Sequence, residues 1–518
     1  MGSSSGSFPC LRGSAEQTQP AVHNGLANPS DTAPSEGLAD VEKQDVMDKF
    51  EKLSTLSHLK VDWDIVKGIS IQQSLRSCGK LWIRSSKDLD TLAGEAIWHE
   101  SQHVKDFDVF LSHTWKTSGA LKVLSLSLQY GHHVILSFWV CGVLTAFLLA
   151  ALGLLPVLDF QIEVNYAGCF KGTCRVGPWI MLAGPLSCLL GLLAFPYLPQ
   201  IRGRPPVCFL DVASIHQTDG KLMERGIYGI GGFLSLTRDL RVLWSPPYLS
   251  RLWCVFELAA YRRANPSGKI TLAPMFVEVA SCMLMLMQLF AHLIWWICGR
   301  SPKWLWLAVA FAPCLPAIHL LRHTYRTKRQ LFSDLEKFDL TLVQCSSTFD
   351  KEFIHGAIIQ WYGSKEAFTM FVRGPLRKEL LSALVSGPVL PYPWLVVTPN
   401  VTSQLTGLAG AYNCGAPLCG LVARAVANLL GGNLHFVVSF RLMLYLCERF
   451  AARRGGRVRD FGQSLLIFVA FSVFGYMGAV ITSRLTAVRS AVMWALWTLL
   501  CERLSARYLK PPSFQGVA

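Results

Sequence analysis

The sequence predicts an α/β fold: a five-stranded parallel sheet interrupted by two transmembrane hairpins and followed by an all-α membrane bundle. Two observations lead to this prediction. Apolar residues make up 51% of the chain and charged residues only 16%, and long apolar runs recur along it. Between those runs, short β-branched and aromatic segments alternate with helical patterns, which is typical of βαβ units.

The charge balance fits a membrane protein. The 518 residues carry a net charge of +15. Lys and Arg gather at the cytoplasmic ends of membrane spans, so we attribute this charge to the flanks of spans rather than to nucleic-acid binding. The expected partner is the lipid bilayer, with no nucleic acid.

The two ends of the chain look different from its middle. Residues 1–45 are rich in Gly, Ser, Ala and Pro and lack an apolar core, so we expect a disordered tail rather than a signal peptide. Residues 46–105 form an N-terminal cytoplasmic region, with a helix and short ordered pieces. Residues 504–518 form a C-terminal tail.

Eight or nine apolar segments approach the roughly 20 residues that a spanning helix needs. Hairpin 1 covers 133–198, hairpin 2 covers 276–321, and the C-terminal bundle covers 380–503. The expected spans are His133–Leu155, Trp179–Leu198, Phe276–Cys298, Trp304–Leu321, Leu380–Val397, one or two within 403–447, Phe461–Ile481 and Ala487–Cys501.

Basic clusters set the expected topology. "RHTYRTKRQ" (322–330), "RGPLRK" (373–378) and "RFAARRGGRVR" (449–459) belong on the cytoplasmic side. Residues 1–130, 200–272 and 322–378 then lie in the cytoplasm. The sequon at Asn400 falls outside, where it is either a glycosylation site or a chance match. Which organelle holds the protein is not indicated.

The sixteen cysteines include no CxxC pair, so we expect no zinc site of that type. Cys169 and Cys174 lie in the polar segment of hairpin 1. They are either a disulfide facing an oxidising lumen or two free thiols.

The sheet is expected in three blocks, 106–131, 200–275 and 336–372. Its five strands are "FDVFLSH" (107–113), "PVCFLD" (206–211), "RVLWS" (241–245), "KITLAPM" (269–275) and "FDLTLVQCS" (338–346). A helix after the first strand should end at Gly131. The helix in "SRLWCVFELAAYRRAN" should be N-capped by Ser250.

These blocks resemble a TIR domain. The resemblance rests on the first strand Asp108–Ser112, the second strand ending at Asp211, and Ser250 followed by Trp253, Cys254, Glu257 and Leu258. It implies a flavodoxin-like, TIR-type sheet. The hydrophobic hairpins within the domain are similar to those of multi-pass TIR-like proteins of some unicellular algae.

TIR domains act either as self-associating adaptors or as enzymes that cleave the nicotinamide glycosidic bond of NAD. The resemblance makes Glu257 the catalytic candidate and NAD the possible substrate, with no certain cofactor. The positive charge that develops on the ribose suits a nearby carboxylate. At helical spacing, Trp253 and Tyr261 could flank it. The structural alternative is that Glu257 pairs with Arg251 or Arg262.

Other candidate residues follow strand ends, because ligands of such sheets bind beyond the carboxyl ends of the strands. They are Ser112, His113 and Trp115 after the first strand, and Asp211 after the second. We expect no metal. "GIYGIGG" (226–232) lies within a helical pattern, so we do not interpret it as a dinucleotide fingerprint.

Three functions follow from these features. The first is a membrane-anchored scaffold that signals through self-association of its cytoplasmic domain. The second is an NAD glycohydrolase that uses Glu257. The third is a transporter or channel with a TIR-like regulatory domain, for which the sequence offers no internal repeat and no acidic intramembrane pair.

Overall fold

The computed structural model describes residues 59–83, 91–158, 160–166, 170–199, 203–298, 311–345, 347–386, 390, 392–452 and 455–509. All of them belong to one compact unit. The tail expected over residues 1–45 and most of the one expected over 504–518 lie outside the described residues.

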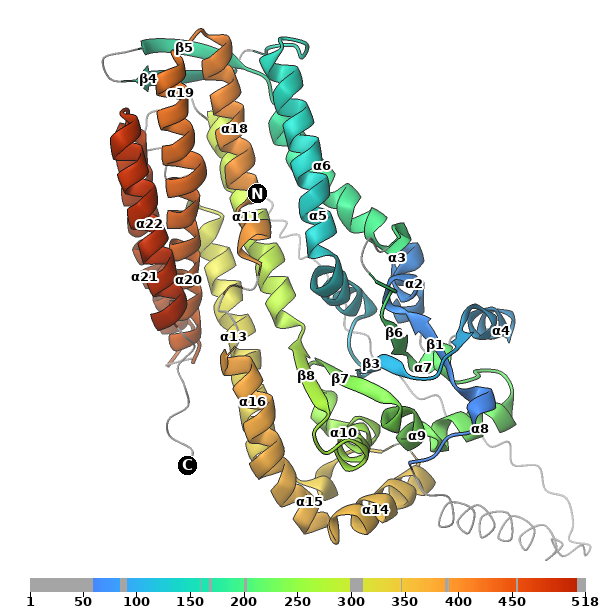
Figure 1. Cartoon of the computed structure of the whole chain (residues 1–518). Coiled ribbons are helices and arrows are strands. Elements are labelled where there is room, and N and C mark those ends of the chain that lie inside the picture. The colour runs from blue at the N-terminus through green and yellow to red at the C-terminus, as the bar shows by residue number, and fades with distance from the viewer. Residues whose placement is uncertain are drawn as a thin grey trace, which may run out of the picture. The chain divides into compact units, whose positions relative to one another are not determined.

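Outside the long apolar helices, the chain builds a mixed six-stranded sheet with short helices around it (Figure 1). Its order is β2-β1-β6-β3-β7-β8. The strands are β1 (Lys67–Ser70), β2 (Gln102–His103), β3 (Phe107–Ser112), β6 (Val207–Phe209), β7 (Thr237–Trp244) and β8 (Lys269–Pro274). The four parallel strands are β6, β3, β7 and β8.

The first expected strand lies between two of the other expected strands. Val109 of β3 is in register with Cys208 of β6 on one side and with Asp239 of β7 on the other. The strand "FDVFLS" is almost wholly buried because it lies at the centre of the sheet between these two partners. Segments separated by about 100 residues of sequence thus pair directly.

The prediction of a fifth parallel strand over 338–346 is wrong. Residues Leu340–Leu342 form a 3-10 turn, which begins where the Asp339 side chain accepts a hydrogen bond from the backbone of Thr341. Only an isolated bridge joins Gln344 to Arg251. The sheet is extended at its other edge instead, where β1 and β2 from the N-terminal region pair antiparallel.

Shorter helices connect the strands or follow the last membrane hairpin. They are α2 (Ile71–Ser74), α3 (Arg76–Ile83), α4 (Thr91–Glu100), α7 (Asp211–Ser214), α8 (Gly220–Tyr228), α9 (Ile230–Ser235), α10 (Leu252–Ala264), α14 (Thr348–Tyr362) and α15 (Lys365–Phe371). The predicted cap of α10 is wrong. Ser250 belongs to a 3-10 turn (Tyr248–Ser250) and donates to the Pro247 carbonyl, and Arg251 is the N-cap.

One helix runs from the sheet into the first hairpin. Helix α5 spans Gly119–Ala151 without a break, so the predicted end at Gly131 is wrong. Gly131 is instead a packing position: a Cβ atom there would lie 2.7 Å from Cγ of Phe195. The return helix α6 (Trp179–Ala194) packs along α5, and it ends in a 3-10 turn that contains Phe195.

The connection within hairpin 1 is a β-hairpin that the sequence did not reveal. Strands β4 (Phe160–Tyr166) and β5 (Phe170–Val176) pair antiparallel at the far end of α5 and α6 (Figure 1). Cys174 is a buried free thiol in β5, and Cys169 lies outside the described residues.

The remaining helices form the second hairpin and the C-terminal bundle. They are α11 (Phe276–Cys298), α13 (Cys314–Glu336), α16 (Arg377–Ser386), α17 (Pro393–Val396), α18 (Thr398–Asn413), α19 (Leu418–Ala425), α20 (Asn433–Arg449), α21 (Arg457–Arg484) and α22 (Val488–Tyr508), with π-helical turns at Val372–Leu376 and Val426–Gly432.

Within the described residues, five helices are long and apolar enough to cross a membrane: Gly119–Ala151, Trp179–Tyr197, Phe276–Ile294, Leu418–Arg449 and Arg457–Arg484. This number is consistent with a multi-pass membrane protein. The predicted span Leu380–Val397 is not one helix, because α16 ends at Ser386 and α17 begins at Pro393. Part of the predicted span Trp304–Leu321 lies outside the described residues.

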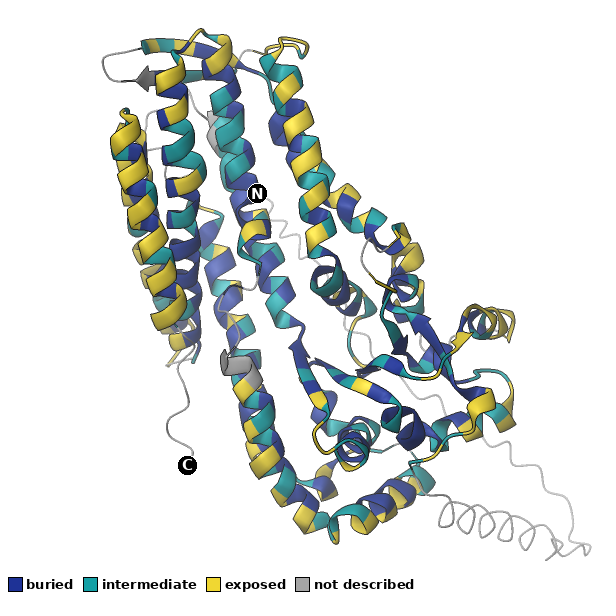
Figure 2. Cartoon of the chain, in the orientation of Figure 1, coloured by how far each residue is buried: buried dark blue, intermediate teal, exposed yellow. Residues whose placement is uncertain are grey.

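Burial separates the sheet from the outer helices (Figure 2). The sheet strands are mostly buried, whereas α21 and α22 expose large apolar side chains such as Leu466, Met493 and Trp497. Exposed apolar surface of this extent is what a lipid-facing helix carries.

The basic segment 322–330 is helical. It continues α13, and two of its charges are buried against the bundle. Arg322 pairs with Asp460 of α21 at 3.1 Å, and Lys328 pairs with Glu448 of α20 at 2.6 Å.

Asn400 is also buried, in α18, where its amide donates to the Asn433 side chain. The predicted sequon is therefore inaccessible to glycosylation in this fold.

Candidate functional site

The candidate site lies where the parallel strands end. Strands β6, β3 and β7 run in the same direction, so the residues that follow them meet at one edge of the sheet. Ser112 is the last residue of β3 and His113 follows it. Asp211 follows β6 as the first residue of α7.

Glu257 reaches this edge from α10. That helix buries most of its side chains, which fixes the direction in which the glutamate points. Its Oε2 accepts a hydrogen bond from the hydroxyl of Ser112. The same hydroxyl lies 2.5 Å from the hydroxyl of Tyr248, so tyrosine, serine and glutamate form one chain of hydrogen bonds.

The alternative in which an arginine neutralises Glu257 is wrong. Arg262 pairs with Glu379 at 2.5 Å and donates to backbone carbonyls after α10. The bridge from Arg251 to Gln344 is a backbone pairing. Among the described residues, no lysine or arginine comes within 4 Å of the Glu257 carboxyl.

The surroundings favour the protonated form of this carboxyl. Glu257 is half-buried by surface area, yet protein surrounds it closely. The loss of solvent is the main cause that raises the pKa of Glu257 to about 8. The hydrogen bond from Ser112 opposes this shift, and the nearby charge of Asp211 adds to it. At neutral pH the group is therefore mostly a carboxylic acid.

The other predicted residues at this edge are also brought together. The indole of Trp115 donates to Oδ2 of Asp211 at 2.7 Å. The ring of His113 lies edge-on to Trp115, with 4.7 Å between centroids. Nδ1 of His113 faces the Leu111 carbonyl, and its buried Nε2 has no hydrogen-bond partner. Burial lowers the pKa of His113 to about 4, so the ring is neutral.

Sequence reasoning missed two residues here, Lys122 and Tyr248. Lys122 lies in the first turns of α5 and is fully buried, and its ammonium has no hydrogen-bond partner. It lies 4.5 Å from the ring centroid of Trp115. Burial lowers the pKa of Lys122 to about 8, and Asp211 opposes that shift. The sequence did offer a signal for Lys122, because it is the single charged residue within "ALKVLSLSLQYG". Tyr248 offered none.

Trp253 makes its hydrogen bond and its ring contacts outside this cluster, and its binding role stays a prediction. Its indole donates to Asp350 of α14 at 3.3 Å, and its ring packs on Phe256 and Phe353. Tyr261 also points elsewhere, since its hydroxyl donates to the Arg238 carbonyl.

The arrangement offers a particular chemistry. A protonated carboxyl, a neutral imidazole and a buried lysine without a hydrogen-bond partner gather at one sheet edge. Perturbed groups of this kind cluster at functional sites more often than elsewhere. In the described part of the chain, the residues that could hold a metal ion lie in the membrane bundle rather than here.

Comparison with protein-family models, with curated proteins and with solved structures finds no match to this chain.

Proposed function

We propose that the protein is a multi-pass membrane protein whose cytoplasmic, TIR-like sheet domain hydrolyses the nicotinamide glycosidic bond of NAD with Glu257. The observation that supports the proposal best is the position of Glu257. It lies at the carboxyl edge of the sheet, bonded to Ser112, and no arginine is close enough to neutralise it.

The raised pKa fits a cationic substrate. The nicotinamide ring of NAD carries a positive charge, and bringing that charge beside Glu257 favours the carboxylate. The carboxylate then stabilises the positive charge that develops on the ribose as the bond breaks. Both electrons of the bond go to nicotinamide, water adds to the ribose carbon, and one proton is released.

The test is to incubate the detergent-purified full chain with NAD and to measure free nicotinamide. We expect release by the wild type and its loss in Glu257→Gln. Wild-type protein that releases no nicotinamide would exclude the activity.

The scaffold, the first of the functions expected from sequence, is the second candidate here, and one observation favours it. Glu257 is protonated and hydrogen-bonded to Ser112 within the protein, so its polar group is satisfied without any ligand. In that case the domain acts through self-association. Cross-linking in intact membranes would show dimers or larger assemblies that Glu257→Gln leaves unchanged.

A further inference from the structure

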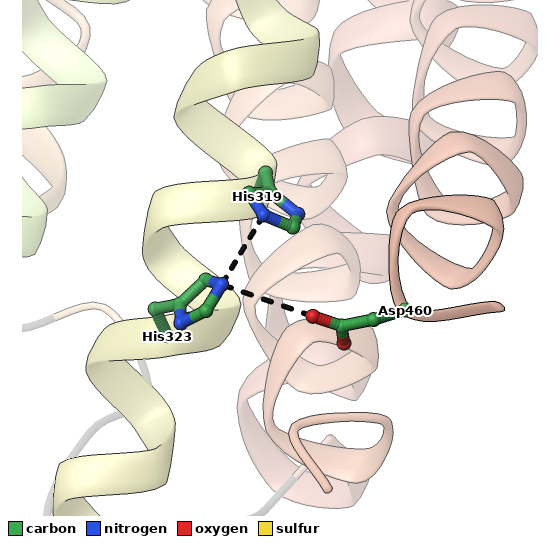
Figure 3. A group of neighbouring side chains, drawn as sticks. All are labelled: His319, His323 and Asp460. Carbon is green, nitrogen blue, oxygen red and sulfur yellow. Dashed lines mark hydrogen bonds and ion pairs between the residues drawn. The ribbon is translucent and has the colours of Figure 1, made fainter. Parts of the chain in front are cut away.

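A cluster of two histidines and one aspartate lies far from the sheet edge, between α13 and α21 (Figure 3). His319 and His323 are four residues apart on α13, so they share one face of that helix. Asp460 lies in the first turn of α21. One donor atom from each of the three residues lies within 4.8 Å of the other two.

We propose that His319, His323 and Asp460 bind a borderline divalent transition metal such as Zn²⁺. This proposal is independent of the NAD activity. Two imidazoles and one carboxylate are ligands that zinc accepts, with a fourth position left for water.

The separations between donor atoms fit such an ion. Nε2 of His319 and Nε2 of His323 are 3.2 Å apart. Two ligands at tetrahedral positions around zinc are about 3.3 Å apart, given Zn–N bonds of about 2.0–2.1 Å. Nε2 of His323 lies 3.8 Å from Oδ2 of Asp460, and the three ligand atoms lie within 4.8 Å of one another, so an ion would draw the Asp460 oxygen toward the two histidines.

Residues that contact the three proposed ligands hold them in this orientation. Nδ1 of His319 lies 2.8 Å from the Ser464 hydroxyl, which holds the ring with Nε2 toward His323. Arg322 donates to both the backbone carbonyl and the Oδ1 atom of Asp460. Such contacts orient ligands and leave the Oδ2 atom of the carboxylate facing the histidines.

Arg326 is the competitor for this site. Its guanidinium bonds Oδ1 of Asp460 at 2.5 Å and Nδ1 of His323 at 3.2 Å. A guanidinium only donates, so Nδ1 of His323 accepts and its Nε2 carries the proton. Metal binding at Nε2 moves that proton to Nδ1 or releases it. If the proton moves to Nδ1, the hydrogen bond from Arg326 to Nδ1 of His323 breaks. Whether or not it moves, the positive charge of Arg326 repels the metal ion.

The experiment uses the full chain, purified in detergent, stripped with a chelator and titrated with Co²⁺ and Zn²⁺. We expect visible Co²⁺ absorption bands of nitrogen ligation, displaced by Zn²⁺. His323→Gln and His319→Gln should each weaken binding about tenfold or more. His99→Gln, an exposed histidine on α4, is the matched control and should bind normally.

Arg326→Gln tests the competition. Removing one positive charge near the ion should tighten binding by about tenfold. Binding that survives in both cluster-histidine variants would overturn the site, as would wild-type affinity weaker than about 1 mM. His323 is partly exposed, with 44% of its side chain accessible, so the His323→Gln variant should fold and give a clean result.

Discussion

Ser112 and Glu257 share a hydrogen bond although they are 145 residues apart in sequence. The bond joins the end of the central strand β3 to helix α10, and a membrane hairpin lies between the two in the chain. It shows that the interrupted blocks build a single edge of the sheet.

Glu257→Gln separates the two candidate functions. The change keeps the shape of the side chain and its ability to bond Ser112, but it removes the charge that a transition state would use. If the residue is catalytic, nicotinamide release should fall by about a hundredfold, which corresponds to about 3 kcal/mol. Glu352→Gln, an exposed glutamate on α14, is the control. Equal activity in the Glu257 variant and the wild type would rule out this role.

The pH dependence of stability should reveal the protonated Glu257. Its pKa is about 8 in the fold, above its ordinary value of 4.5. Between pH 4.5 and pH 8, Glu257 is protonated in the folded state and ionised in the unfolded chain. Its contribution to the stability of the fold therefore falls as pH rises from about 5 to 8. The melting temperature of Glu257→Gln relative to the wild type should rise over that window. A constant difference would contradict the raised pKa.

Lys122→Met should stabilise the fold at neutral pH. The buried ammonium has a pKa of about 8, below its ordinary value of 10.5, so it destabilises the fold at pH below about 8 and ceases to do so above 10.5. We expect a gain of about 1–2 kcal/mol at pH 7 that shrinks as pH rises through this range. Thermal melts at several pH values measure it. A loss of stability would mean that the contact with Trp115 outweighs the desolvation cost.

The pair Lys328 and Glu448 should hold α13 to α20. Both side chains are 8% exposed, so removing one partner leaves a buried charge alone. Lys328→Met should cost about 3 kcal/mol, and adding Glu448→Met should recover most of it. Arg204→Met, which removes an exposed pairing with Asp106, should cost less than about 1 kcal/mol. A double variant no better than the single one would argue against this pairing.

Much of the sheet could be predicted from sequence because its central strands are short, apolar and ended by polar residues. The same pattern failed at the edges. Residues 338–346 look like a strand but turn at Leu340–Leu342, and β1 and β2 are too short to give a periodic signal. The site was predictable to the same extent. Ser112 and Asp211 could be predicted because they follow strand ends, whereas Tyr248 lies beside Ser112 only because of tertiary packing.

Helix α5 has a mechanical consequence. Its 33 residues form one rod about 50 Å long at 1.5 Å per residue, and Lys122 lies near the end that packs against the sheet. The apolar end of a spanning helix adjusts its tilt to the hydrocarbon thickness around it. Because no break separates the two ends, we expect a change in lipid composition that tilts this helix to move Lys122 relative to Trp115 and Asp211. Assays of this protein should therefore be run in bilayers of controlled thickness.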